Sequence, residues 1–359
     1  MGVLYKSHEV SIMSNVTTLG IDLAKSVFQL CGLNQARKIV FNKKVSRANL
    51  ISQVRQHPKA LIAMEACGSA HHWARTFVAM GYTVRLLPTQ HVKALSRGNK
   101  SDALDALAIA ETVFRPNIHA VAPKALEQQD VQVLLRIRLR HKELRKGNVN
   151  QVRGLLREYG LVMPKTIVQF ERHLPSILED VENGLTFVAR TALNELYQEH
   201  LRLSKKIQKA ELELKKIAQS HPIAVQLMQL RGIGAITSLA LYACIGTGKQ
   251  FKNARQLSAW LGLVPKQHGT GGITRLGSIS KRGNTYLRVL LIHGARSVMN
   301  WMKSKDDDLS LWTKKLAQRH GKHKAMVALA NKTARMVWVV LHKGVDALPR
   351  QHLSTPTCS

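Results

Sequence analysis

Four acidic side chains are the residues of this sequence best suited to chemistry. Asp22 ends the run GID, Glu65 ends the run AME, and Asp102 and Asp105 lie three residues apart in KSDALDA. Carboxylate oxygens are the ligands that Mg²⁺ prefers, and two Mg²⁺ ions can stabilise the attacking and the leaving oxygen of a phosphodiester together. We therefore predict a catalytic magnesium site made of Asp22, Glu65, Asp102 and Asp105.

Each of these acids also has an ordinary structural interpretation. Asp102 could cap a helix, Asp22 could stand in a turn, and Glu65 could pair with a nearby lysine or arginine. Their combined spacing, in a chain that is short of acids, favours metal binding over separate structural roles.

The elements around these acids predict how they come together. Three short β-rich runs, TTLGIDLAK, SVFQLCGL and KIVFNKKV, have connections short enough for antiparallel hairpins. A helix from about Ser46, the strand ALIAME, a helix from about Ala70, the strand YTVRLLP and a helix from about Ser101 follow. This order predicts a ribonuclease H-like α/β domain over residues 16–124, in which neighbouring strand ends open onto one crevice.

The composition predicts a nucleic-acid partner. The chain has 359 residues, and its 54 lysines and arginines against 22 aspartates and glutamates give a net charge of +32. Solubility requires only a small part of that charge, so the excess indicates a polyanion. The four cysteines are far apart without CxxC spacing, which predicts neither a zinc site nor a disulfide framework and fits a reducing cytoplasm.

The sequence gives no sign of a membrane partner. Residues 1–15 lack the apolar core of a signal peptide, and no apolar run approaches the ~20 residues of a membrane span. We expect residues 1–15 to be disordered, with Met13 as an alternative start, and residues 348–359 to form a disordered tail. A cytoplasmic location fits these features.

A basic helical segment opens the linker that we predict over residues 125–222. Few acids interrupt its cations, so we interpret it as a phosphate-binding face rather than an ordinary solvated helix face. The residues of this predicted face are Arg136, Arg138, Arg140, Lys142, Arg145, Lys146 and Arg153, with Arg157 beyond them.

A heptad-like pattern follows in the same linker. Apolar positions from Leu193 through Leu203 and Ile207 to Ile217 alternate by three and four residues, the spacing of a coiled coil. This pattern predicts a helical stalk or a contact in a homodimer or homotetramer. A helix packed within its own chain explains the pattern nearly as well.

Residues 223–347 are expected to form a mainly helical C-terminal domain. LRGIGAITSLA is typical of a helix-hairpin-helix, in which Gly232 and Gly234 would turn backbone amides toward a DNA phosphate, although an ordinary turn between helices has the same spacing. The segment LGLVPKQHGTGGITRLGSISKRGNTYLR, with Lys281 and Arg282, predicts an exposed, flexible, phosphate-facing loop.

Together these segments resemble the insertion-sequence transposases of the DEDD class, the one-ten family, and its eleven-eleven subgroup in particular. The resemblance is carried by GIDLAK, MEACGSAHHWA, KSDALDA, LRGIGAITSLAL and the block WLGLVPKQH…GG…GSISKRGN…LR. It implies a RuvC-like N-terminal domain, a coiled-coil linker and a C-terminal transposase domain with a nucleophilic serine. It further implies double-stranded DNA at the element ends and target as substrate, chosen with a structured guide RNA.

The chain departs from that pattern at the expected serine. The family's loop reads Ser-Ser-Gly-Gly or Ser-Thr-Gly-Gly, whereas this chain has Gly269, Thr270, Gly271 and Gly272. One alignment places the nucleophile at Thr270, which keeps a hydroxyl, and the other places it at Gly269, which would leave this copy inactive. Ser278 and Ser280 are nearby hydroxyls with ordinary loop and cap interpretations.

Three other functions are compatible with parts of the sequence. A junction-cleaving nuclease would use the four carboxylates to hydrolyse DNA without rejoining it. A sugar-kinase relative would explain GIDLAK as a phosphate loop, but the charge and the second aspartate pair disfavour it. A decayed, non-catalytic nucleic-acid-binding protein would explain the altered serine loop.

Overall fold

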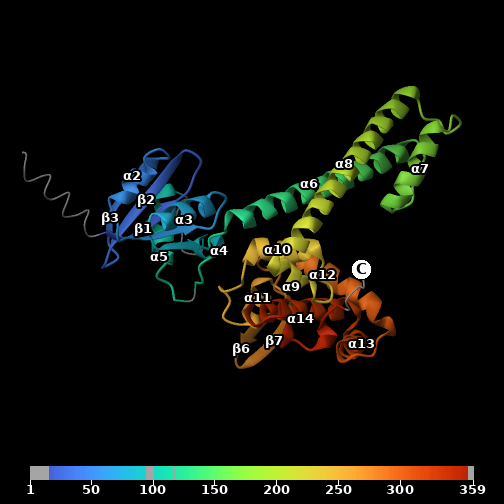
Figure 1. The fold of residues 1–359 in the computed structure, drawn as a ribbon. Coiled ribbons are helices and arrows are strands. Elements are labelled where there is room, and N and C mark those ends of the chain that lie inside the picture. The colour runs from blue at the N-terminus through green and yellow to red at the C-terminus, as the bar shows by residue number, and fades with distance from the viewer. Residues whose placement is uncertain (1–15, 94–100, 117, 355–359) are drawn as a thin grey trace, which may run out of the picture. The chain divides into compact units, whose positions relative to one another are not determined.

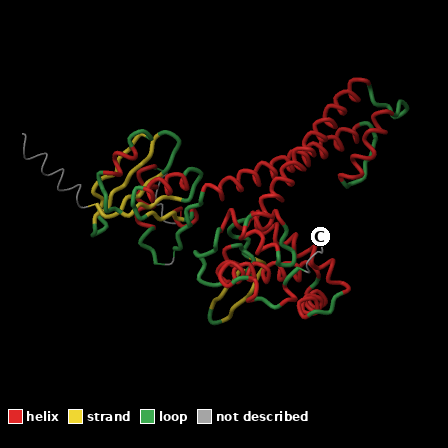
Figure 2. Tube along the Cα trace, in the orientation of Figure 1, coloured by secondary structure: helices red, strands yellow, loops and turns green. Residues whose placement is uncertain are grey.

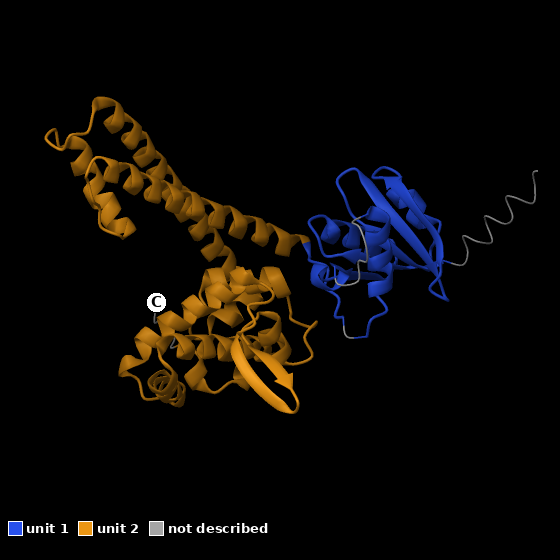
Figure 3. Ribbon diagram, turned by 180° about the vertical axis from the view of Figure 1, so that it is seen from behind, with its two compact units in different colours: residues 1–125 blue, residues 126–359 orange. Residues whose placement is uncertain are grey.

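A computed structural model describes residues 16–93, 101–116 and 118–354 of the chain. The chain divides into two compact units, residues 1–125 and residues 126–359 (Figure 3). The predicted disorder of residues 1–15 lies outside the described residues. Within the described part of the chain, no helix combines the length and the apolar character needed to cross a bilayer.

The first unit is built on a five-stranded mixed sheet in the order β3-β2-β1-β4-β5 (Figure 1). The predicted hairpins are confirmed, since β2 pairs antiparallel with both β1 and β3, whereas β4 runs parallel to β1 and to β5. The strands are β1 (Val16–Asp22), β2 (Val27–Asn34), β3 (Ile39–Ser46), β4 (Leu61–Glu65) and β5 (Val84–Leu87). This mixed sheet is consistent with the predicted ribonuclease H-like domain.

Helices cover both faces of this sheet. The core on one face joins alternate strand residues such as Ile21 and Met64 to α2 (Leu50–Arg55) and α3 (Ala70–Ala79). On the other face, α5 (Asp102–Thr112) packs through Ala106 and Ala110 against Cys31 and Leu33. The short helix α4 (Thr89–Lys93) lies between β5 and α5 in the chain. Because strand side chains alternate between faces, this layering also decides which acids point toward α5.

The second unit contains a long pair of antiparallel helices, α6 (Leu126–Glu158) and α8 (Phe187–Ser220), with α7 (Ile167–Glu179) packed at the far end (Figure 1). The apolar stripe predicted on α8 is buried: Leu193, Leu203, Ile207 and Leu214 lie within the chain. The pattern therefore reflects packing of α8 within its own chain, mainly on α6. We call the α6–α8 pair with α7 the stalk.

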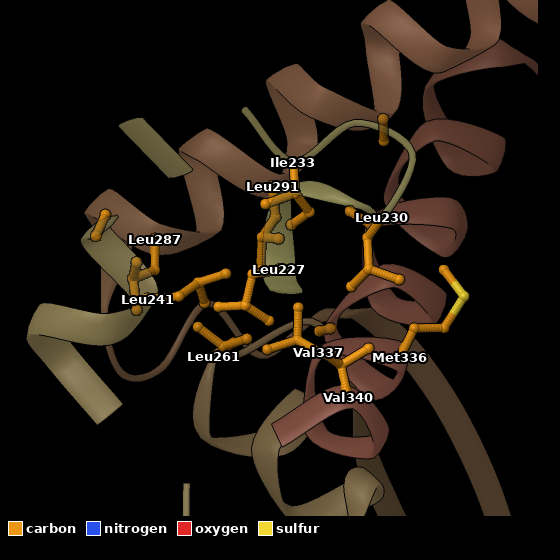
Figure 4. Packing of buried hydrophobic residues seen from close by; sticks show 14 of the residues in the cluster. Leu227, Leu230, Ile233, Leu241, Leu261, Leu287, Leu291, Met336, Val337 and Val340 are labelled. Carbon is orange, nitrogen blue, oxygen red and sulfur yellow. The ribbon is translucent and has the colours of Figure 1, made fainter. Parts of the chain in front are cut away.

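The remaining helices of the second unit surround one large apolar core. Leu227, Leu241, Leu291 and Val337 meet in it (Figure 4). The elements of this body are α9 (Pro222–Met228), α10 (Ala235–Ile245), α11 (Ala254–Trp260), α12 (Thr285–Trp301), η1 (Met302–Ser304), α13 (Asp308–His320), α14 (Lys322–Lys343), η2 (Val345–Ala347) and η3 (Arg350–His352).

The segment predicted as a flexible loop is instead a β-hairpin. Strands β6 (Pro265–Thr270) and β7 (Ile273–Ile279) pair antiparallel around Gly271 and Gly272, whose φ values are 57° and 80° (Figure 2). Two glycines with positive φ suit the tight turn that joins twisted strands. Side chains of both strands are exposed on both faces of the hairpin, apart from partial cover at Ile279.

Residues 348–354, the described part of the tail predicted over 348–359, contact the helical body, and residues 355–359 lie outside the described residues. Leu353 forms a β-bridge with Leu230, and the Arg231 guanidinium donates to the Leu353 carbonyl over 3.0 Å. His352 is buried, and the Ser354 amide donates to the Gln229 carbonyl. Backbone groups of this segment therefore find hydrogen-bond partners on the body.

Candidate functional site

Asp22 and Glu65 lie side by side at the ends of two neighbouring parallel strands. The β1–β4 register pairs Ile21 with Met64, so the next position on each strand is Asp22 and Glu65. Parallel neighbours lie about 4.8 Å apart, and side chains alternate between the faces of the sheet. Because Ile21 and Met64 enter the α2–α3 core, both carboxylates face the side that α5 covers.

Gly20 allows α5 to bring its two aspartates to the same place. A Cβ atom at Gly20 would lie 2.4 Å from the Ala106 carbonyl oxygen and 2.7 Å from the Ala110 Cβ, so α5 packs directly on the β1 backbone. Asp102 and Asp105 occupy the first turn of α5, and Ser101, not Asp102, is the N-cap residue. The capping interpretation of Asp102 is therefore wrong, and its carboxylate is not used at that cap.

Two partly buried hydrogen bonds fix the start of α5 beside Asp22. Gln29, which pairs with Asp22 in the β1–β2 register, donates from Nε2 to Asn42 Oδ1 over 2.7 Å. Asn42 in turn donates from Nδ2 to the Ala103 carbonyl over 2.9 Å. Sequence reasoning missed both residues, although a glutamine inside an otherwise apolar strand is a detectable signal. These two hydrogen bonds hold the first turn of α5 at a fixed place on the sheet.

The pKa of Asp22 reflects the negative charge around it. Burial raises the pKa of Asp22 above its ordinary value, and the other carboxylates raise it further, in the order Asp105, Asp102, Glu65. Four like charges around one crevice are stable only when a proton or a cation offsets them. In the described residues, neither Asp22 nor Glu65 forms an ion pair, which leaves the pairing interpretation of Glu65 unsupported.

The donor set suits a hard cation, although its geometry is open. Among the described residues, no three acidic, histidine or cysteine side chains are arranged closely enough to form a ready metal site. The oxygen ligands are nevertheless of the kind that Mg²⁺ prefers, and Mg²⁺ keeps several water molecules when it binds carboxylates. Gln29 Oε1 is buried without a hydrogen-bond partner, which makes it a free acceptor for such a water molecule.

The basic face predicted on α6 divides into paired and exposed cations. Arg138 is buried and donates from Nε to Glu211 Oε1 over 2.8 Å, so its guanidinium holds α6 to α8. Arg145 donates to Ser204 Oγ, and Arg153 donates to the carbonyls of Pro164 and Thr166. These three side chains serve packing within the stalk, which the sequence could not reveal because their partners are distant in it.

The exposed cations of α6 are Arg136, Arg140, Lys142, Lys146 and Arg157. Partial burial, together with the positive charge of Arg138, lowers the pKa of Lys142. An approaching phosphate would relieve this repulsion between cations. The exposed set therefore remains the candidate phosphate-binding face of the stalk.

The two glycines of the predicted helix-hairpin-helix have different roles. Gly232 has φ 84°, and a Cβ on it would meet the Gly294 carbonyl oxygen at 2.9 Å, so it packs the turn against α12. Gly234 is the exposed N-cap residue of α10, with open space around it. Gly232 thus acts in packing, and of the two glycines only Gly234 is exposed.

The β6–β7 hairpin presents Thr270 at its exposed tip and is rigid at its base. Arg288 is buried and donates to the carbonyls of Leu261 and Arg282, each over 2.9 Å. A Cβ on Gly262 would lie 2.2 Å from the Arg282 carbonyl oxygen, which shows how tightly the base is packed. Lys281 has φ 54°, a conformation uncommon for lysine, and its side chain is exposed, as is that of Arg282. Both cations therefore sit on a fixed backbone.

The chain matches two transposase family models. Residues 19–161 match a DEDD-type transposase model, and residues 224–309 match the model described as transposase IS116/IS110/IS902 family. The transposase for insertion sequence element IS1111A of Coxiella burnetii is 44% identical over 347 residues, covering 95% of each chain. The transposase for insertion sequence element IS1328 of Yersinia enterocolitica is 36% identical over 332 residues, covering 92% of this chain and 98% of the relative.

Proposed function

The chain belongs to the IS116/IS110/IS902 family of insertion-sequence transposases, and from this starting point we propose that it breaks and rejoins DNA at the ends of its element with Mg²⁺. The observation that carries the proposal is the position of three carboxylates, Asp105, Asp102 and Glu65, near enough to Asp22 to raise its pKa, which burial also raises. A phosphodiester is the substrate for which such a cation site has an evident use.

Asp22, Glu65, Asp102 and Asp105 would hold the metal. Bound Mg²⁺ would neutralise charge on the phosphate oxygens and polarise the bond to be broken. The protein's own contribution is to place the ligands. Asp22 and Glu65 are fixed by their places at two strand ends. The first turn of α5 is fixed by the hydrogen bonds from Gln29 to Asn42 and from Asn42 to the Ala103 carbonyl.

The second chemical group is a hydroxyl nucleophile in the β6–β7 hairpin, at Thr270 or at the position of Gly269. Attack by a side-chain hydroxyl forms an O–P bond as one phosphodiester bond breaks, so the bond energy is retained for rejoining. This retention removes the need for a high-energy cofactor. Thr270 is the only one of the two residues that carries a hydroxyl.

Double-stranded DNA and a structured guide RNA are the proposed partners, acting at the bacterial nucleoid. The support for an extended polyanion is the net charge of +32 together with its distribution. From Leu214 to Lys305 the sequence contains no aspartate or glutamate at all. The exposed cations of α6, the exposed N-cap Gly234, and Lys281 with Arg282 are the candidate phosphate contacts.

A second copy of the chain is the proposed partner of the stalk's far end. Phe187, Val181 and Val162 are 83%, 81% and 80% exposed, the highest values among the large hydrophobic residues described. Residues 160–200 contain more acids than lysines and arginines, in contrast to the rest of the chain. An apolar, locally acidic surface suits a protein partner better than a phosphate backbone, which supports assembly as a homo-oligomer.

The direct test is a strand-transfer assay with the element's own ends and flanking RNA. Alanine at Asp22, Glu65 or Asp102 should abolish transfer while circular dichroism shows retained folding, because loss of one ligand unbalances the metal charge. Glu111→Gln, on the same helix α5 but farther along, is the matched control and should stay active. Unchanged transfer in two of the three alanine variants would remove the metal site from the proposal.

The products of the same assay separate the competing functions. Rejoined strands and a protein–DNA adduct indicate a recombinase, whereas hydrolysed ends without an adduct indicate a nuclease. DNA binding without any product would indicate a decayed copy. A Gly269→Ser variant, run in parallel, tells whether the altered loop is the cause.

A further inference from the structure

The two faces of the β6–β7 hairpin carry different chemistry. The strand register pairs Thr270 with Ile273 and His268 with Arg275, and the pair between them is Gly269 with Thr274. Successive residues of a strand point to opposite faces, and directly paired residues share one. Thr270, His268 and Arg275 therefore lie on one face, which we call the hydroxyl face.

Lys266 lies on this face as well. A Cβ atom on Gly277 would be 3.9 Å from the Lys266 Cβ, and Gly277 is two residues beyond Arg275 on β7. The hydroxyl face thus carries Lys266, His268 and Arg275 around Thr270. On the turn side of the register shift between Pro265 and Gln267, the opposite face carries no basic side chain, because its members are Gln267, Gly269, Thr274 and Leu276.

The hairpin is poorly stabilised on its own and suited to a polyanionic partner. A two-stranded hairpin is marginally stable in water, and here Ile273 and Leu276 are 66% and 70% exposed, one on each face. No acid in the hairpin or its flanks opposes the cations. The residues that flank its base are nevertheless tied to α12 by the Arg288 hydrogen bonds to the Leu261 and Arg282 carbonyls.

We propose that the hydroxyl face contacts the scissile phosphate, with Arg275 binding its non-bridging oxygens and His268 accepting the proton of the attacking hydroxyl. This inference rests on the proposed function. The Thr270 Oγ–P bond forms as the P–O bond to the leaving deoxyribose oxygen breaks. The hydroxyl proton passes to the His268 imidazole, and the leaving oxygen takes a proton from water. Residues two apart on a strand are about 6.6 Å apart, within reach of an imidazole and a threonine hydroxyl that converge on one phosphate.

The same geometry selects Thr270 over position 269 as the nucleophile. Gly269 points to the opposite face, where no cation would stabilise a pentavalent phosphate. A serine at 269 fits sterically, because the nearest atoms to its Cβ are 3.8 Å and 3.9 Å away. Gly269→Ser should therefore fold normally and still not replace Thr270 as the attacking group.

The test uses the full chain with end-labelled DNA carrying the element's ends and flanking RNA, with the covalent adduct quantified on denaturing gels. Arg275→Ala should slow adduct formation about 100-fold or more, and Arg275→Lys should recover part of the rate. His268→Asn should slow it by at least about 100-fold and flatten the dependence of the rate on pH, because the variant has no imidazole to accept the proton. Gln267→Ala, on the opposite face of the same strand, should stay within about twofold.

Several outcomes would overturn the inference. The first is a Gln267→Ala variant as slow as His268→Asn, and the second is a His268→Asn pH profile that matches the unmodified chain. Adduct formation by Gly269→Ser in a Thr270→Val background would also overturn it, while leaving the proposed recombinase intact. Absence of an adduct from the unmodified chain and from every variant overturns the inference too. In that case DNA hydrolysis that still depends on Asp22 identifies a nuclease, so the two failures are distinguishable.

Discussion

Substitution of Gly20 by alanine should damage the carboxylate site without touching any carboxylate. Gly20 lies in β1 under α5, and an alanine Cβ there would be 2.4 Å from the Ala106 carbonyl oxygen and 2.7 Å from the Ala110 Cβ. Carbon atoms in proteins normally approach to about 3.5–4.0 Å, so α5 must retreat by about 1 Å. Because Asp102 and Asp105 are in the first turn of α5, they move with it.

The expected magnitudes follow from that displacement. Overpacking of a buried contact destabilises a protein by about 1–3 kcal/mol. Since about 1.4 kcal/mol corresponds to a factor of ten, amide exchange in β1 and α5 should accelerate about 5- to 150-fold where it follows unfolding of this unit. A misplacement of about 1 Å in a catalytic constellation can reduce the rate about 100-fold.

Hydrogen-exchange mass spectrometry on the full chain measures the acceleration of amide exchange. The strand-transfer assay measures the reduction in rate. Gly68→Ala is the matched control, because Gly68 is in the same unit and a Cβ there would meet nothing within 4 Å. If Gly20→Ala and Gly68→Ala exchange and react alike, the close approach of α5 to β1 does not position the acids.

Three further predictions concern charge. Because the pKa of Asp22 is raised in the folded chain, its ionisation opposes folding as pH rises above the ordinary value of 3.8. In thermal unfolding without Mg²⁺, Asp22→Asn should therefore be more stable than the unmodified chain at pH 7, and this difference should disappear near pH 4. Equal stabilisation at both pH values would contradict the prediction. Arg138→Met should lower the free energy of unfolding by about 1–2 kcal/mol, a value reduced because Glu211 is 41% exposed, and leave the salt dependence of DNA binding unchanged. Arg136→Ala with Arg140→Ala should reduce that slope by up to about 2 in fluorescence anisotropy titrations, and an unaltered slope would place the phosphate contacts elsewhere.

The sequence was sufficient to predict the sheet and the acids at its strand ends. Hydrophobic alternation and short connections determine β1, β2 and β3. A carboxylate at the end of an apolar strand is predicted to lie at the edge of the sheet. Asp22 and Glu65 therefore emerge from local pattern alone. The position of α5 depends on Gly20, whose role becomes evident only when the helix is seen packed on it.

Contacts between distant residues account for what the sequence did not reveal. Arg138 looks like its exposed neighbours until Glu211, 73 positions away, is placed beside it. The hairpin contains lysine, glutamine, histidine and glycine where β-formers are expected, so composition indicated a loop. The Gly271–Gly272 pair was the available hairpin signal. The bridge between Leu353 and Leu230 joins residues far apart in the chain, so no local pattern could indicate it.

The measurement that tests the central claim most directly is the Mg²⁺ dependence of strand transfer by the unmodified chain and by Asp22→Asn. The product is read as rejoined DNA from the element's ends in the presence of the flanking RNA. We predict a product that increases with Mg²⁺, disappears with a chelator, and is absent from Asp22→Asn at every Mg²⁺ concentration. Rejoined DNA formed equally well by Asp22→Asn, or by the unmodified chain in excess chelator, would contradict the account.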